Sequence, residues 1–113
     1  MKTHNMKLAV EPFNKIKDGS KIIEIRLFDE KRKDINLGDQ IVFFKQPEEI
    51  EKLKTQVIGL FRFNSFEDLF NDFPLEYFGH SNREILISKV YQFYTHEQEK
   101  EFGVLGIKIK VIK

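Results

Sequence analysis

Hydrophobic and polar residues alternate along several stretches of the chain, and this alternation predicts β-strands. Side chains in a strand point to its two faces in turn, so an alternating stretch buries one row and exposes the other. In Lys21–Asp29 three apolar residues share one parity, whereas Glu24 and Arg26 share the other. Gly59, inside a later stretch, predicts a bulge or bend. The other predicted strands are Met6–Val10, Ile41–Lys45, Thr55–Phe63 and Gly103–Ile112.

Helical spacing replaces this alternation in three places. Glu11–Gly19 predicts a short helix, with Pro12 at its first position and Gly19 as its left-handed end. Ser65 fits an N-cap before apolar residues spaced as on a helix face that runs to Pro74. Ser81 and Glu84 form a second capping signature, before a helix with Leu86, Val90 and Phe93 or Tyr94 on one face. The connections are expected at Asp29–Asp34, Gln46–Lys54, Leu75–Phe78 and Thr95–Glu101, the last charged and outside the core.

The order of these elements is β-α-β-β-β-α-α-β, which lacks the repeated strand–helix–strand units of a doubly wound sheet. It predicts an α+β fold, a small and mainly antiparallel β-barrel with flanking helices. We expect residues 1–113 to form a single domain. At 113 residues the chain is long enough to bury a core without a metal or disulfide.

Composition narrows the function classes. The absence of Cys excludes disulfides and thiolate chemistry, and the cytoplasm is therefore the expected compartment. No apolar run approaches the roughly 18 residues of a membrane span, and the N-terminus does not resemble a signal peptide. The three His lack ligand spacing, so neither a metal nor a cofactor is expected. Residues 1–33 carry nine basic against five acidic residues, which is enough for a few phosphate contacts only.

The strand Lys21–Asp29 carries the best candidates for chemistry. Lys21 is either a solvated strand end or a cation that holds a phosphate or a carbonyl oxygen. Glu24 and Arg26 form either a structural ion pair, which contributes about 0–1 kcal/mol when exposed, or a ligand site. In a ligand site, the Glu24 carboxylate would accept a hydrogen bond from the edge of a base or orient a water molecule, and the Arg26 guanidinium would bind a phosphate with two hydrogen bonds. Stacking rings could come from Tyr94 or Phe44, and Lys31–Lys33 is either a solvated loop tip or a phosphate contact.

Three motifs together resemble the ASCH domain family, whose fold is related to PUA RNA-binding domains. They are Pro12-Phe13-x-x-Ile16-x-x-Gly19-Ser20-Lys21-x-x-Glu24-x-Arg26, then Gly38-Asp39-x-Ile41-x-Phe43, then Gly103-Val-Leu-Gly-Ile107. The resemblance implies a PUA-like barrel that binds RNA or nucleotides in a cleft beside the Gly-x-Lys strand. One bacterial branch hydrolyses the acetyl amide of N4-acetylcytidine with a Lys, a Thr and a Glu. The Lys of that branch matches Lys21 of this sequence. The position of its Thr is occupied here by Glu24, and the position of its Glu is assigned to Glu76.

Two hypotheses follow. The first is an RNA- or nucleotide-binding module whose ligand contacts are Lys21, Glu24, Arg26 and Tyr94. The alternative is a small amidohydrolase acting on an acylated nucleoside such as N4-acetylcytidine, with Lys21, Glu24 and Glu76 as catalytic residues. A closed nucleoside-sized pocket around Lys21 would favour the enzyme, whereas an open groove with positive rims would favour the binding module. No membrane partner is expected, and the sequence leaves the ligand and the oligomeric state open.

Overall fold

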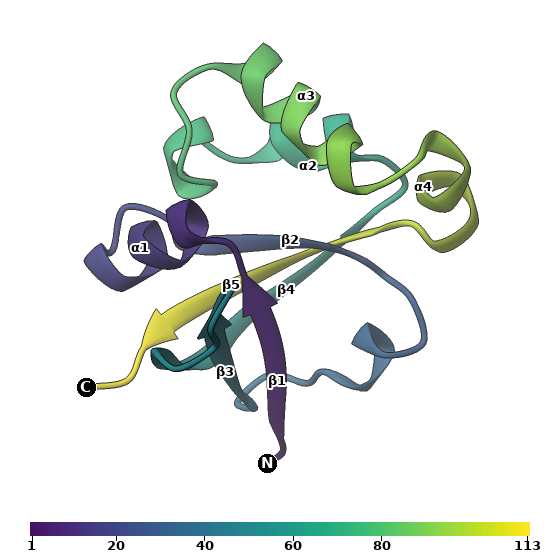
Figure 1. Ribbon diagram of the computed structural model, residues 1–113. Helices are drawn as coiled ribbons and strands as arrows, with labels where there is room; N and C mark the ends of the chain where they lie inside the picture. Colours follow the sequence, from purple (N-terminus) through teal and green to yellow (C-terminus); the bar gives the residue numbers. More distant parts are fainter.

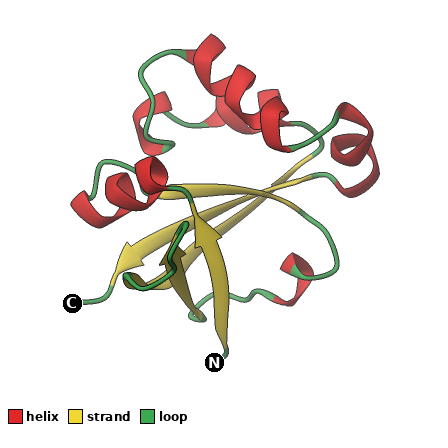
Figure 2. Cartoon of the chain, viewed as in Figure 1, coloured by secondary structure: helices red, strands yellow, loops and turns green.

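The computed structural model describes the whole chain, Met1–Lys113, as one sheet with helices packed beside it (Figures 1 and 2). The helices α2, α3 and α4 gather on one side of the sheet, whereas α1 lies at the end of β1 (Figure 1). The strands are β1 (Thr3–Leu8), β2 (Ile23–Leu27), β3 (Gln40–Lys45), β4 (Lys52–Phe63) and β5 (Val104–Val111). The helices are α1 (Val10–Asp18), α2 (Phe66–Asp72), α3 (Arg83–Phe93) and α4 (His96–Phe102), with short 3-10 turns at Arg32–Asp34 and Leu75–Tyr77. None of the helices combines the length and the apolar character that a membrane-spanning helix needs.

The five strands form one mixed sheet in the order β1-β3-β4-β5-β2. The β1–β3 pairing is parallel, and the other three pairings are antiparallel. The sheet curls into a half-barrel whose edge strands, β1 and β2, are not paired with each other. The α+β class is therefore confirmed, and the predicted barrel is an open one. The expected bulge is also present, because the β4–β5 register shifts between Val57 and Gly59.

Two hydrophobic cores lie on the two faces of the sheet. The helical side covers Ile23, Ile25 and Leu27 of β2. Glu24 pairs directly with Ile107, and Arg26 pairs with Leu105, so these side chains share the other, concave face. The concave core consists of Met6, Leu8, Phe13, Ile16, Ile35, Ile41, Phe43, Val57, Leu105, Ile107 and Ile109. Both rows of β2 therefore face packed interior, and its polar row is not solvated.

Helix α1 begins one residue earlier than the sequence predicts. Val10 is its first residue, so Val10 lies outside β1 and Pro12 occupies the third helical position. Proline is tolerated there for the predicted reason, because the first N–H groups of a helix have no intrahelical partner. Gly19 ends the helix with φ 87°, as expected of a left-handed C-cap.

The side-chain hydrogen bonds at the N-termini of the helices show which of the predicted helix starts are correct. Ser65 accepts a hydrogen bond from the Asp68 N–H, as predicted. The N-cap of α3 is Asn82 rather than Ser81, because the Asn82 side chain accepts from the Ile85 N–H. Thr95–Glu101 is charged and, apart from Glu99, exposed outside the hydrophobic cores, as predicted, but it is helical instead of an irregular connection. It forms α4, capped by Thr95, and its inward residue is a carboxylate, so it shows no apolar period.

The connection Gln46–Lys54 is also shorter than predicted. Strand β4 begins at Lys52, which pairs with Phe44 of β3. The start of β4 has a single apolar residue, Leu53, between Lys52 and Lys54, and one apolar position is too few to show an alternating pattern. The exposed loop is therefore confined to the residues before Lys52.

Candidate functional site

Lys21, Glu24 and Arg26 converge into one charged network, which we call the triad. The Lys21 Nζ atom donates to Glu24 Oε1 at 2.8 Å. The Arg26 Nε atom donates to Glu24 Oε2 at 2.9 Å, and Arg26 Nη2 lies 2.8 Å from the same oxygen. The Ile25 N–H also donates to Glu24 Oε1, at 3.1 Å. The carboxylate therefore accepts three hydrogen bonds and has the Arg26 Nη2 group in ion-pair contact as well.

Burial makes this network more than a surface ion pair. The side chains of Lys21, Glu24 and Arg26 are 9%, 5% and 14% exposed. Burial alone would raise the pKa of Glu24, but the charges of Lys21 and Arg26 outweigh it and lower the pKa to about 2. Burial opposes the charge of Arg26, and the adjacent Glu24 carboxylate nevertheless raises its pKa. Glu24 and Arg26 are accordingly charged at neutral pH.

The triad also links the open edges of the half-barrel. Arg26 Nη2 donates to the backbone oxygen of Lys7 on β1, at 3.0 Å, across the unpaired gap between β1 and β2. The backbone N–H of Lys21 donates to Lys15 O of α1. Two N–H groups on Arg26 Nη1 and two of the three Lys21 ammonium protons keep no protein partner. The network thus joins β1, β2 and α1, and part of its N–H groups have no partner within the protein.

Two lysines, Lys15 of α1 and Lys89 of α3, lie near Lys21 around His80, and we call them the basic rim. Lys15 of α1 donates to the backbone oxygen of Gly79 at 2.6 Å. Lys15 and Lys89 both bind Glu11 Oε1, at 3.0 and 3.1 Å. The segment between α2 and α3, which carries Gly79, lies directly above α1 (Figure 1). The rim therefore combines α1 and α3, and sequence reasoning missed it because its members are far apart along the chain.

The pKa of His80 is sensitive to the positive charges of the basic rim. Burial lowers the pKa of His80, and the charges of Lys15, Lys89 and Lys21 lower it further, to about 4. We expect the His80 resonances to titrate near pH 4 in an NMR pH titration, well below the pH near 6.5 of an unperturbed histidine. Replacing Lys89 with Ala should move the midpoint upward. A midpoint that stays at pH 6 or above in the unmodified protein would contradict this electrostatic picture.

The other predicted residues lie around the triad or apart from it. Tyr94 is half-buried against Phe66, with ring centroids 5.6 Å apart, and burial raises its pKa. It is near enough to Arg26 and Glu24 for their charges to act on it, but it forms no hydrogen bond with them. Phe44 lies under the Lys52 ammonium, 5.6 Å from its ring centroid. Glu76 is exposed on the turn Leu75–Tyr77 and makes no ion pair with Lys21.

The charged loop before β3 is largely self-compensating. Arg32 pairs with Asp29 at 3.3 Å, and Lys33 pairs with Glu30 at 2.9 Å. Only the Lys31 side chain lacks such a pair, so the loop adds little net attraction for phosphate. No group of three or more His, Cys, Asp or Glu side chains is arranged to hold a metal ion.

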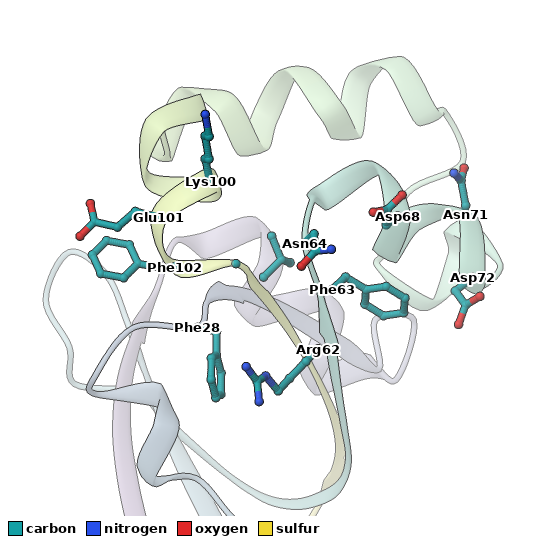
Figure 3. Close-up of a pocket in the computed structure, with 12 residues that line it drawn as sticks. Phe28, Arg62, Phe63, Asn64, Asp68, Asn71, Asp72, Lys100, Glu101 and Phe102 are labelled. Atoms are coloured by element: carbon teal, nitrogen blue, oxygen red, sulfur yellow. The ribbon is translucent and has the colours of Figure 1, made fainter.

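A separate cleft of about 950 Å³ lies at the far end of β2, where β4 ends and β5 begins (Figure 3). None of the triad residues lines it. The Arg62 guanidinium lies over the Phe28 ring, with its carbon 4.0 Å from the ring centroid. No local pattern in the sequence indicates this cleft, because its walls come from the ends of several elements. They are Phe28, Arg62, Phe63, Asn64, Asp68, Asn71, Asp72, Lys100, Glu101, Phe102, Gly103 and Val104.

Comparisons with known proteins agree with the motifs in the sequence. The family model of the ASCH domain matches residues 6–113. The crystal structure of the hypothetical protein PH0355 is 38% identical, with a TM-score of 0.87 over 99% of this chain and 100% of that one. The solution NMR structure of protein PF0455 from Pyrococcus furiosus is 34% identical, with a TM-score of 0.75 over 98% of both chains. The comparison with curated proteins found no match.

Proposed function

We propose that this chain, which belongs to the ASCH domain family, binds RNA or a nucleotide at the triad and the basic rim. The observation that carries the proposal is that Lys15, Lys89 and Lys21 lie together around His80, and that Lys21 shares the Glu24 carboxylate with Arg26. Each of the carboxylates Glu11 and Glu24 is shared by two of these four cations, so a positive excess and unpartnered N–H groups remain for the phosphate groups of a nucleic acid. The half-barrel with helices on one side also suits the PUA-like relationship implied by the family resemblance.

The contacts in the triad assign different roles to its members. Lys21 and Arg26 keep free N–H groups, so they are the direct phosphate contacts in this proposal. Both oxygens of Glu24 already bind protein cations, so in this proposal Glu24 holds the two cations in place instead of recognising a base edge. Tyr94 borders the network and would supply aromatic contact only after a side-chain movement, since it already packs on Phe66.

The amidohydrolase alternative stays a hypothesis. It requires a proton acceptor, and a carboxylate with a pKa of about 2 is a weak base at neutral pH. Glu76 would have to move toward Lys21 to take part. Incubation with N4-acetylcytidine tests this directly: turnover that disappears in Lys21→Ala would support the enzyme, and the absence of turnover would exclude this substrate.

The binding proposal predicts a loss of affinity when the basic rim is neutralised. The double variant K15A/K89A should bind single-stranded RNA about tenfold more weakly at low salt. A plot of log affinity against log salt concentration has a slope of about −0.7 for each phosphate contact on a single strand. Removal of two contacts should therefore make this slope shallower by about 1.4. Fluorescence anisotropy with a labelled oligonucleotide measures both quantities.

A matched control separates a specific rim from general charge. Lys54→Ala and Lys110→Ala each remove an exposed lysine without an ion pair from the sheet, and together they change the net charge equally. Their double variant should retain most of the affinity. Equal losses in both double variants would reduce the interaction to nonspecific attraction. No binding to any RNA by the folded protein would refute the proposed function.

A further inference from the structure

We infer that the cleft at Phe28 and Arg62 is a second site, which binds a nucleobase of single-stranded RNA. The inference rests on the proposed function for the choice of RNA, but it uses different residues. A volume of about 950 Å³ lies at the upper end of the range of ligand pockets and accommodates a base with its sugar.

The stacked pair Phe28–Arg62 supplies a preorganised planar platform. Phe28 is anchored by its backbone N–H, which donates to Gly103 O at 3.0 Å, and its ring packs against the concave core. The Arg62 guanidinium lies on that ring and forms no hydrogen bond or ion pair with the protein. Figure 3 shows the two side chains next to each other among the residues that line the cleft. A guanidinium plane held in this way can stack on a base at low entropic cost.

The walls of the cleft carry polar side chains without internal partners. The carboxylates of Asp68 and Asp72 and the amides of Asn64 and Asn71 make no side-chain hydrogen bond or ion pair within the protein. This contrasts with the triad, whose carboxylate already binds two protein cations. Carboxylate and amide groups together accept from and donate to the edges of unstacked bases. The cleft is therefore equipped to recognise a base edge, which Glu24 is not.

The charged side chains of the cleft indicate which kind of ligand it favours. The cleft contains the cations Arg62 and Lys100 against three acidic side chains, Asp68, Asp72 and Glu101, so it does not attract a phosphate strongly. A cationic peptide side chain would meet the unpaired Arg62 guanidinium at the floor. A neutral, planar group with donors on its edge satisfies both the stacked platform and the acidic wall. Among RNA components, that group is the base.

The position of the cleft allows one RNA strand to occupy both sites. Arg26 and Phe28 lie two residues apart and have the same parity, a separation of about 7 Å along a strand. Arg26 on β2 and Arg62 on β4 both pair directly opposite Leu105 of β5, so all three side chains share one face. Phosphates on the triad would thus place a neighbouring base near Arg62.

The test is a two-dimensional NMR titration of the ¹⁵N-labelled protein with single-stranded hexamers of G, A, U and C and with the four nucleoside monophosphates. We expect the Arg62 Nε–H and Gly103 N–H signals to shift with at least one hexamer. Arg62→Ala and Arg62→Lys should each weaken that oligonucleotide about tenfold, because lysine keeps the charge and loses the planar stack. Lys54→Ala, on the same strand, is the matched control and should have no such effect.

The possible results are distinct. Shifts at both Gly103 and the Lys21–Arg26 strand support both proposals, whereas shifts confined to Lys21–Arg26 overturn the nucleobase site and leave the proposed function intact. Shifts confined to the cleft support the nucleobase site and refute the triad as the ligand contact. Full affinity in Arg62→Lys would overturn stacking. No shift with any oligonucleotide or nucleotide, in a protein whose spectrum remains folded, would refute both proposals.

Discussion

Replacing Glu24 with alanine is expected to lower the free energy of unfolding by about 3–5 kcal/mol, because it leaves two buried cations without their shared anion. Lys21 and Arg26 would then repel each other inside a packed interior, and the Ile25 N–H would lose an acceptor. Since domains of this size are stable by about 5–15 kcal/mol, the variant should fold but unfold at a much lower urea concentration. Equilibrium urea unfolding followed by circular dichroism measures the change.

An exposed ion pair is the matched control for this prediction. Glu30 pairs with Lys33 at 2.9 Å, but its side chain is 89% exposed, so Glu30→Ala should cost at most about 1 kcal/mol. The stability of the wild-type protein should also depend on pH through the Glu24 carboxylate. The pKa of Glu24 is lowered from near 4.5 to about 2, so its contribution is present above pH 4.5 and is lost as the pH falls toward 2. Equal costs for the two variants would show that the triad contributes no more than a surface pair.

Sequence reasoning found the triad but not its burial. The spacing of Lys21, Glu24 and Arg26 placed two of these residues on one strand face, and the ASCH resemblance marked all three. Alternation alone predicts that the polar row of a strand faces solvent. It cannot show that Leu105 and Ile107 of a strand 80 residues later lie beside Glu24 and Arg26. Burial depends on that pairing, which is a property of the tertiary fold.

The basic rim and the cleft show the same limit. Lys89 meets Glu11 across 78 residues, and no local pattern indicates such a contact. The stack of Arg62 on Phe28 likewise joins β4 to the residue that follows β2. In α4, the inward side chain is Glu99, which accepts from the Phe66 N–H at 2.7 Å and from the Tyr91 hydroxyl. A helix that docks through a carboxylate has no hydrophobic period to detect.

A buried network that closes the edge of a half-barrel raises the question of whether stability alone explains it. Buried ion pairs are weak evidence for stability, because well-packed apolar residues of similar volume often serve as well or better. If the triad existed only to hold β2 against β1, an apolar replacement would meet that need without the desolvation of three charges. The free donors on Lys21 and Arg26 are what an apolar replacement would remove.

The triple variant K21M/E24L/R26M should therefore separate the two roles. Its free energy of unfolding should lie within about 1 kcal/mol of the wild-type value, far above that of Glu24→Ala, because no buried charge is left unpaired. Its affinity for single-stranded RNA should fall between about tenfold and a hundredfold, since two charge-assisted contacts are lost. Urea unfolding and fluorescence anisotropy on the same preparation measure both. A triple variant that is stable and binds RNA as tightly as the wild type would assign the triad to structure alone and move any RNA contact to the rim and the cleft.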